Sequence, residues 1–185
     1  CSSIRKYYQT NEIIIFDNST IKQFPKDLID VFDITYIDNT TNKILNFEQL
    51  FSKYKKDPRI VKQNNLGSAN HCITIDFLIK YINTNFILLD SDVLLKTQID
   101  FIDEKYITIG ALSSDERKLN LNRQLRIFPF LQYFNVTKIK QYNISYFNSS
   151  EMVGIDSQKQ IYDTGASFYK TLCISHANEI KSNVN

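Results

Sequence analysis

The chain has 185 residues, of which 43% are hydrophobic and 23% charged, and its formal net charge is +2. These values are ordinary for one globular domain with a substantial core. The small net charge argues against a nucleic-acid-binding protein that depends on a strong basic field, and no apolar run approaches the ~18 residues of a membrane span. The three cysteines form no CxxC pair, so we expect Cys72 and Cys173 to be buried, reduced thiols of a cytoplasmic protein.

The first third of the chain predicts short helices that alternate with buried strands. Residues 2–8 have the pattern of a helix end, and residues 13–16 form an apolar run that ends at Asp17 and several turn-forming residues. Asp17 is equally suited to capping the following turn and to contacting a ligand. The other elements predicted here are a helix over 26–31, a strand over 34–37, a helix over 47–54 and a strand over 59–62.

A loop rich in asparagine and glycine opens the next predicted helix, over residues 69–82. Ser68 is suited to cap this helix, and one apolar stripe runs along it: Cys72, Ile75, Ile79 and Ile82. Such a loop lets the backbone approach a ligand closely, although a plain connection has the same composition. His71 lies near the helix start and receives no role, because a histidine there is more often packed or solvent-exposed than a ligand.

The most informative stretch is an apolar run at residues 86–89 that leads into Asp90-Ser91-Asp92. The run is short and has no polar alternation, which predicts a strand buried on both faces. Asp90 and Asp92 then lie at its carboxyl end, where open α/β sheets bind ligands. On an extended chain two carboxylates at this spacing point the same way, and a divalent cation would offset their repulsion. The same tripeptide is also common in turns and helix caps.

The second half of the chain predicts a further strand over 105–112, a polar loop over 113–122, a helix over 131–140 and a strand over 144–147. Four basic residues in or after the loop either meet phosphates or form a solvated face: Arg117, Lys118, Arg123 and Arg126. Asp163-Thr164-Gly165 has the composition of a tight turn, and an apolar run follows it. The alternation of strands and helices predicts the α/β class, with a mostly parallel central sheet and helices on both faces.

Three segments, taken in order, resemble a known family. They are the strand end at Asp17-Asn18-Ser19, the helix-opening loop over 64–70, and residues 88–92 with the DxD motif. This order resembles the nucleotide-sugar glycosyltransferases of the GT-A fold, in particular the bacterial inverting group known as family 2. Residues 126–135 and 162–166 are similar to the acceptor half of bacterial members that build surface polysaccharides. The resemblance covers nearly the whole chain and implies one GT-A domain over 1–185.

The resemblance implies a role for several individual residues. In the family, the aspartate at the position of Asp17 receives the base of the nucleotide, and the loop at Asn65 and Gly67 lies along the nucleoside. The first aspartate of the DxD motif, here Asp90, touches the ribose or the metal. The last one, here Asp92, binds the Mn²⁺ or Mg²⁺ that bridges the sugar diphosphate.

The implied reaction is metal-dependent transfer of a sugar, as in hexosyltransferases, to a hydroxyl of a glycan or lipid-linked glycan acceptor. Asp163 is the candidate base for that hydroxyl. The implied partners are the nucleotide-sugar donor and this acceptor, with no nucleic acid and no membrane span; peripheral membrane contact stays open. Two other readings stay open as well: a nucleotidyltransferase of related fold, and a sugar-nucleotide-binding domain without catalysis.

The chain departs from the family at both ends. The first family strand, which carries a nucleotide-contacting motif, has no counterpart, and no acidic pair follows the Thr-Gly turn. A histidine-containing segment that often completes the metal site would lie beyond residue 185. We therefore expect a piece of a longer protein, trimmed at both ends.

Overall fold

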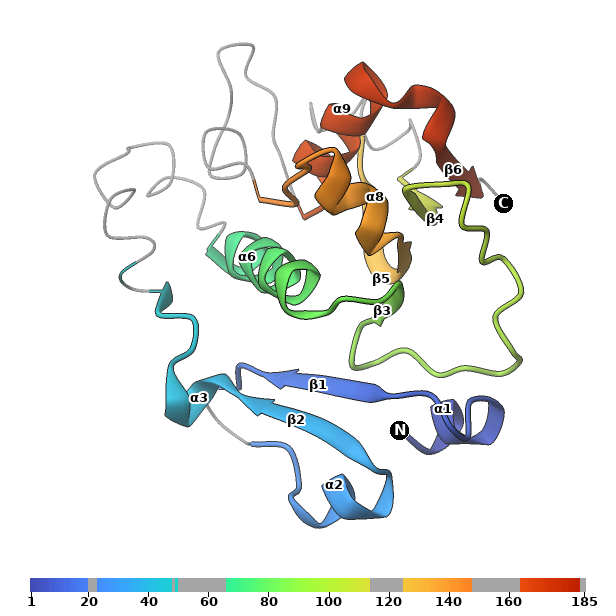
Figure 1. Ribbon diagram of the computed structural model, residues 1–185. Helices are drawn as coiled ribbons and strands as arrows, with labels where there is room; N and C mark the ends of the chain where they lie inside the picture. The colour runs from blue at the N-terminus through green and yellow to red at the C-terminus, as the bar shows by residue number, and fades with distance from the viewer. Residues whose placement is uncertain (20–22, 48, 50–65, 114–124, 148–163, 184–185) are drawn as a thin grey trace. The chain divides into compact units, whose positions relative to one another are not determined.

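The computed structural model describes residues 1–19, 23–47, 49, 66–113, 125–147 and 164–183 (Figure 1). The chain divides into two compact units. Unit 1 comprises Cys1–Leu50 and Leu94–Asp100, and unit 2 comprises Phe51–Val93 and Phe101–Asn185. The predicted mixture of helices and strands is confirmed in both units.

Unit 1 is built on a two-stranded parallel sheet. Its elements are α1 (Ser2–Tyr7), β1 (Ile13–Asp17), α2 (Asp27–Val31), β2 (Ile34–Asp38) and α3 (Asn39–Asn42). The two strands pair from Ile13 with Ile34 to Asp17 with Asp38, so both aspartates lie at the same end of the sheet. Helix α2 forms part of the crossover that two parallel strands require.

Arg5 connects α1 to the rest of unit 1 through hydrogen bonds. Its guanidinium donates to the backbone oxygens of Phe32 at 2.8 Å and Asp33 at 2.8 Å, beyond the end of α2, and to that of Asn11 at 2.5 Å. It also bonds the carbonyl of Tyr8 at 3.1 Å, just past the end of α1. One side chain thus satisfies carbonyl groups that have no helical partner.

Unit 2 contains a four-stranded sheet in the order β3-β5-β4-β6. Its elements are α6 (Leu66–Tyr81), β3 (Phe86–Leu89), β4 (Thr108–Leu112), β5 (Ile127–Phe134), α8 (Val136–Gln141), α9 (Ala166–Ser175), η1 (Ala177–Glu179) and β6 (Ile180–Asn183). Strand β5 runs antiparallel to both β3 and β4, whereas β4 and β6 are parallel. The predicted mostly parallel sheet is therefore wrong for this unit, because the central strand runs against its neighbours.

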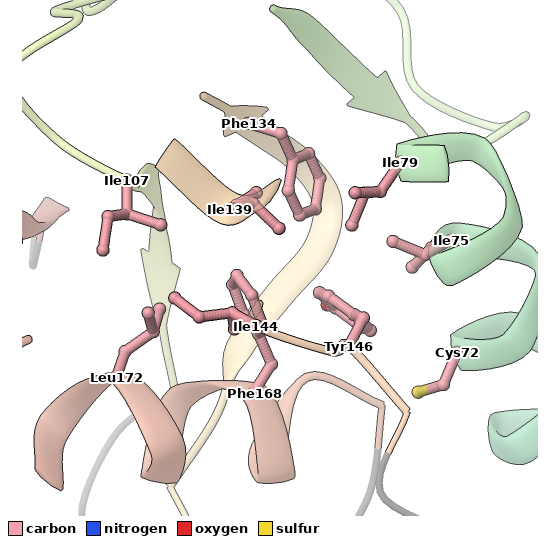
Figure 2. Close-up of a cluster of buried hydrophobic side chains, with 10 residues drawn as sticks. All are labelled: Cys72, Ile75, Ile79, Ile107, Phe134, Ile139, Ile144, Tyr146, Phe168 and Leu172. Carbon is pink, nitrogen blue, oxygen red and sulfur yellow. The ribbon is translucent and has the colours of Figure 1, made fainter. Parts of the chain in front are cut away.

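The core of unit 2 lies between its helices and the sheet (Figure 2). Helix α6 contributes the stripe Cys72, Ile75 and Ile79, which was predicted from the spacing. The other members come from the sheet side, α8, the following loop and α9: Ile107, Phe134, Ile139, Ile144, Tyr146, Phe168 and Leu172. A buried side chain of this size stabilises a fold by about 1.5–3 kcal/mol, so this cluster holds the helices against the sheet.

The predicted helix over 131–140 is wrong in its first half. Residues up to Phe134 belong to β5, and helix α8 begins only at Val136. Pro129, which interrupts the apolar run, lies where the pairing of β4 with β5 is irregular, between the pairs Gly110–Gln132 and Leu112–Ile127. A proline without an N–H is tolerated in a strand at such a bulge.

The predicted strand over 144–147 is also wrong. The backbone N–H groups of Tyr146 and Phe147 donate to the carboxylate of Asp76 on α6, at 2.5 and 3.2 Å. Because a side chain accepts these bonds, this segment does not need a neighbouring strand.

Among the cysteines, Cys72 is buried as expected, whereas Cys173 is exposed on α9. Most of the helix predicted over 47–54 lies outside the described residues. The strand predicted over 59–62 lies wholly outside them.

Candidate functional site

Asp90 lies at the carboxyl end of β3, as the apolar run predicted. Its N–H donates to the carbonyl of Phe130 on β5 at 3.1 Å. Its carbonyl accepts from Val93 N–H at 3.0 Å, which closes a turn over Ser91 and Asp92. The strand therefore presents Asp90 at the edge of the sheet on a backbone that is hydrogen-bonded on both sides.

Asp92 lies in this turn and is exposed. The expectation that Asp90 and Asp92 point the same way assumed extended backbone, in which side chains alternate with a period of two. The chain instead turns directly after Asp90, so the alternation does not apply. Both residues remain candidate metal ligands, because Asp90 begins this short turn and Asp92 lies within it.

His71 of α6 lies beside the Asp90 side chain. Its Nε2 lies 3.7 Å from Asp90 Oδ1, and the two side chains are 34% and 35% exposed. Helix α6 and strand β3 thereby bring two groups able to bind a metal to one solvent-accessible place in unit 2. The sequence interpretation gave His71 no role.

Simple distances could have pointed to His71. A strand of four residues is about 13 Å long at ~3.3 Å per residue, and a helix covers that length in about nine residues. Only residues 82–85 separate the end of α6 from β3, so the chain reverses sharply there. Counting about nine residues back from Tyr81 leads to Cys72, which places the neighbouring His71 opposite the end of β3.

The start of α6 is the second candidate segment. Among the described residues, no atom outside the local helix backbone lies within 4 Å of the site of a Cβ on Gly67, and Gly67 is exposed. Asn70 Oδ1 is buried and, within the described residues, has no hydrogen-bond partner. Asn65, the other residue assigned to the nucleoside, lies outside the described residues.

Asp17 lies in unit 1, and its carboxylate is held by three donors. Oδ1 accepts from Ser19 N–H at 2.8 Å, while Oδ2 accepts from Phe24 N–H at 2.8 Å and from the Tyr36 hydroxyl at 2.6 Å. Burial works to raise the pKa of Asp17, but these hydrogen bonds outweigh it and the pKa lies below the usual value. The capping role, one of the two alternatives for Asp17, is therefore present in the structure.

The proposed base, Asp163, lies outside the described residues, as do Arg117, Lys118 and Arg123. The turn that follows Asp163 is described: Thr164 is buried, and Gly165 has φ of +85° directly before α9. Arg126 is half-buried, with its guanidinium 4.7 Å from the ring centre of Phe128. A stacked arginine beside the sheet is an ordinary packing arrangement as well as a binding group.

The donors at the end of β3 fit a divalent cation. Mg²⁺ and similar ions are commonly held by one or two carboxylates together with the phosphates of a substrate, rather than by a cage made of protein groups alone. Asp90 and Asp92 supply such carboxylates at the end of β3. The described residues contain no group of three or more His, Cys, Asp and Glu side chains that could hold a metal by itself.

No family model matches this chain, and no curated protein or solved structure gives a significant match. In the described ranges, we find no helix with the length and apolar character needed to cross a membrane.

Proposed function

We propose that this chain is a nucleotide-sugar glycosyltransferase domain of the GT-A type, which transfers a sugar from a nucleoside-diphosphate donor to a hydroxyl of a glycan. The observation that carries the proposal is the placement of Asp90 at the carboxyl end of β3, followed at once by a turn that contains Asp92. In open α/β sheets, ligands such as nucleotides bind at the carboxyl ends of strands. The choice of a nucleotide sugar as the donor, and the role in surface polysaccharide synthesis, come from the order of motifs along the sequence.

The proposed transfer reaction depends on the negative charge of the two carboxylates and of the leaving diphosphate. Asp90 and Asp92 would hold Mn²⁺ or Mg²⁺, which as a Lewis acid offsets the charge that develops on the leaving diphosphate. The open backbone at Gly67 leaves room for the nucleoside beside the start of α6. A carboxylate, for which Asp163 is our candidate, would take the proton of the acceptor hydroxyl as the new bond forms on the opposite face of the sugar.

Calorimetry of the 185-residue chain with a panel of nucleoside diphosphates, with and without Mn²⁺, tests the proposal. We expect one of them to bind, and to bind more tightly with Mn²⁺. Asp92→Ala should remove the metal-dependent part of the affinity, whereas Asp100→Ala should not, because Asp100 is an exposed aspartate outside the motif.

Unchanged metal-dependent binding in Asp92→Ala would refute the metal role. Binding of no nucleoside diphosphate at all would refute the proposal. A transfer assay with the matching nucleotide sugar then separates a transferase from a domain that only binds, and release of pyrophosphate from a nucleoside triphosphate would instead indicate a nucleotidyltransferase.

A further inference from the structure

We propose that Phe128 and Phe130 of β5 form a stacking surface for a pyranose ring, beside Asp90 and on the same face of the sheet. The inference rests on the proposed function only in the identity of the sugar, which would belong to the acceptor glycan. Stacking on this surface needs neither a nucleotide nor a metal ion, so sugar binding is measured without them.

The first argument is that an aromatic side chain is exposed on an inner strand of the sheet. Strand β5 lies between β3 and β4, yet Phe130 is 39% exposed. Among the side chains that the structure describes, it is the one large, exposed hydrophobic side chain on a strand. The same face of β5 is fully buried at Gln132 and at Phe134, which belongs to the core (Figure 2). The cover over this face therefore ends before Phe130 and leaves its ring accessible.

The second argument is that neighbouring side chains hold the Phe130 ring in place. Its centre lies 5.5 Å from the ring centre of Phe128, which is half-buried two residues earlier on the strand. The Arg126 guanidinium in turn lies 4.7 Å from the centre of the Phe128 ring. These contacts show that the three side chains share one face. Because they restrict one another, the rings lose little conformational entropy when a ligand stacks on them.

The third argument is the carboxylate next to this surface. Leu89 pairs with Leu131, at the last paired position of β3. One residue further along, the Asp90 N–H donates to the Phe130 carbonyl at 3.1 Å, so these two residues lie opposite each other. Directly opposite residues of antiparallel strands have their side chains on the same face of the sheet. The Asp90 side chain is itself 35% exposed, so a ligand on the rings can reach it.

This combination of groups matches the two kinds of surface on a pyranose. One face of the sugar ring carries C–H groups, which pack against aromatic rings, and its edge carries hydroxyl groups, which donate to carboxylates. Ligand sites commonly combine aromatic side chains with a few polar groups in this way. A nucleobase also stacks on aromatic side chains, but it offers fewer donors to a carboxylate at its edge.

Saturation-transfer difference NMR of the 185-residue chain measures sugar binding directly. The probes are the methyl glycosides of glucose, galactose, mannose and N-acetylglucosamine, without nucleotide and with a chelator that removes metal ions. We expect at least one glycoside to bind, with stronger transfer to the protons of its C–H face than to those at its edge. Transfer to none of the four, equal transfer around the ring, or transfer to uridine and to no glycoside would overturn the inference.

Substitutions at Phe130 then locate the binding surface. Phe130→Leu keeps an apolar side chain but removes the aromatic ring, so it should weaken binding of that glycoside several-fold, up to about tenfold, whereas Phe130→Tyr should retain it. Tyr81→Leu is the matched control, because Tyr81 is an exposed aromatic residue on α6 that stacks on Phe77. It should bind the glycoside as the wild type does. Urea unfolding shows that each variant is folded before binding is compared.

Equal binding by Phe130→Leu and the wild type would overturn the inference, and so would an equal loss in Tyr81→Leu. Calorimetry with nucleoside diphosphates decides the proposed function separately. Glycoside binding that Phe130→Leu weakens, in a chain that binds no nucleoside diphosphate, would support the sugar surface and refute the proposed transferase.

Discussion

Tyr36 on β2 donates its hydroxyl hydrogen to Asp17 at the end of β1, with 2.6 Å between the two oxygens. The same carboxylate accepts from the backbone of Ser19 and Phe24. One buried carboxylate therefore joins the two strands of unit 1 to the segment that follows β1. The residue that the family resemblance assigns to the nucleotide base is also a structural residue of its own unit.

Removal of the Tyr36 hydroxyl should destabilise unit 1. A hydrogen bond to a charged group contributes about 1.5–3 kcal/mol, so we expect Tyr36→Phe to lower the free energy of unfolding by roughly this amount in urea titrations. Tyr81→Phe is the control, because Tyr81 is 51% exposed and keeps its ring contact with Phe77 after the change. An equal effect of both substitutions would show that the bond to Asp17 contributes nothing specific.

The same pair predicts how stability changes at alkaline pH. Burial, the hydrogen bond to Asp17 and the nearby charges raise the pKa of Tyr36 to about 12. This value lies above the ~10 of an unfolded tyrosine, so the stabilisation is fully present below about pH 10 and is lost as the pH rises through about 12. The stability difference between wild type and Tyr36→Phe should therefore shrink in urea titrations above pH 10. A difference that stays constant to pH 12 would contradict this coupling.

Gly165 occupies a position that only glycine fits. Its φ is +85°, and a Cβ there would lie 2.2 Å from the carbonyl oxygen of Ile127. We expect Gly165→Ala to cost at least about 2 kcal/mol, because strained backbone and overlap with a neighbouring main chain add. Thermal unfolding measures the loss.

Gly67→Ala is the matched control for Gly165→Ala, since no described atom outside the local helix backbone lies within 4 Å of its Cβ position in α6. Alanine in a helix is better than glycine by about 0.5–1 kcal/mol, so this variant should be equal to the wild type or slightly more stable. Similar melting temperatures for both variants would show that the turn before α9 adapts to a side chain.

Asp76 of α6 holds the loop that follows α8. Its carboxylate accepts from the Ser145 hydroxyl and the Tyr146 N–H at 2.5 Å each, and from the Phe147 N–H at 3.2 Å. Asparagine offers one acceptor oxygen in place of two, so Asp76→Asn should speed hydrogen exchange of the Tyr146 and Phe147 amides and cost about 1–3 kcal/mol. Asp100→Asn is the exposed control, and unchanged exchange at Tyr146 and Phe147 in Asp76→Asn would show that the loop holds without the carboxylate.

Local patterns were enough to locate the strands that begin with an apolar run. Residues 13–16, 34–37 and 86–89 were predicted as strands, and β1, β2 and β3 cover them. The helical stripe through Cys72, Ile75 and Ile79 was equally clear. These features depend on the order of apolar residues within one element, and a single sequence records that order completely.

Local patterns failed where partners distant in sequence override the preference of the local residues. Residues 131–134 lie beside an amphipathic helix in sequence, yet they form the strand that pairs with β3 and β4. Residues 144–147 contain strand-forming types, but a carboxylate about 70 positions earlier binds their backbone. In both cases the hydrogen-bond partner is distant in sequence, and no window of neighbouring residues contains it.

The candidate site also has one feature that adjacent residues predict and others that the folded chain decides. The apolar run that leads into Asp90-Ser91-Asp92 was sufficient to place Asp90 at a strand end, because strand length and the run of side-chain types are properties of adjacent residues. The folded chain decided between a turn and an extended backbone at Asp92, and it showed that His71 lies beside Asp90. The turn is closed by the bond from Val93 N–H to the Asp90 carbonyl. The position of His71 depends on how α6 packs against the sheet, and packing is set by contacts between elements rather than by the residues within one of them.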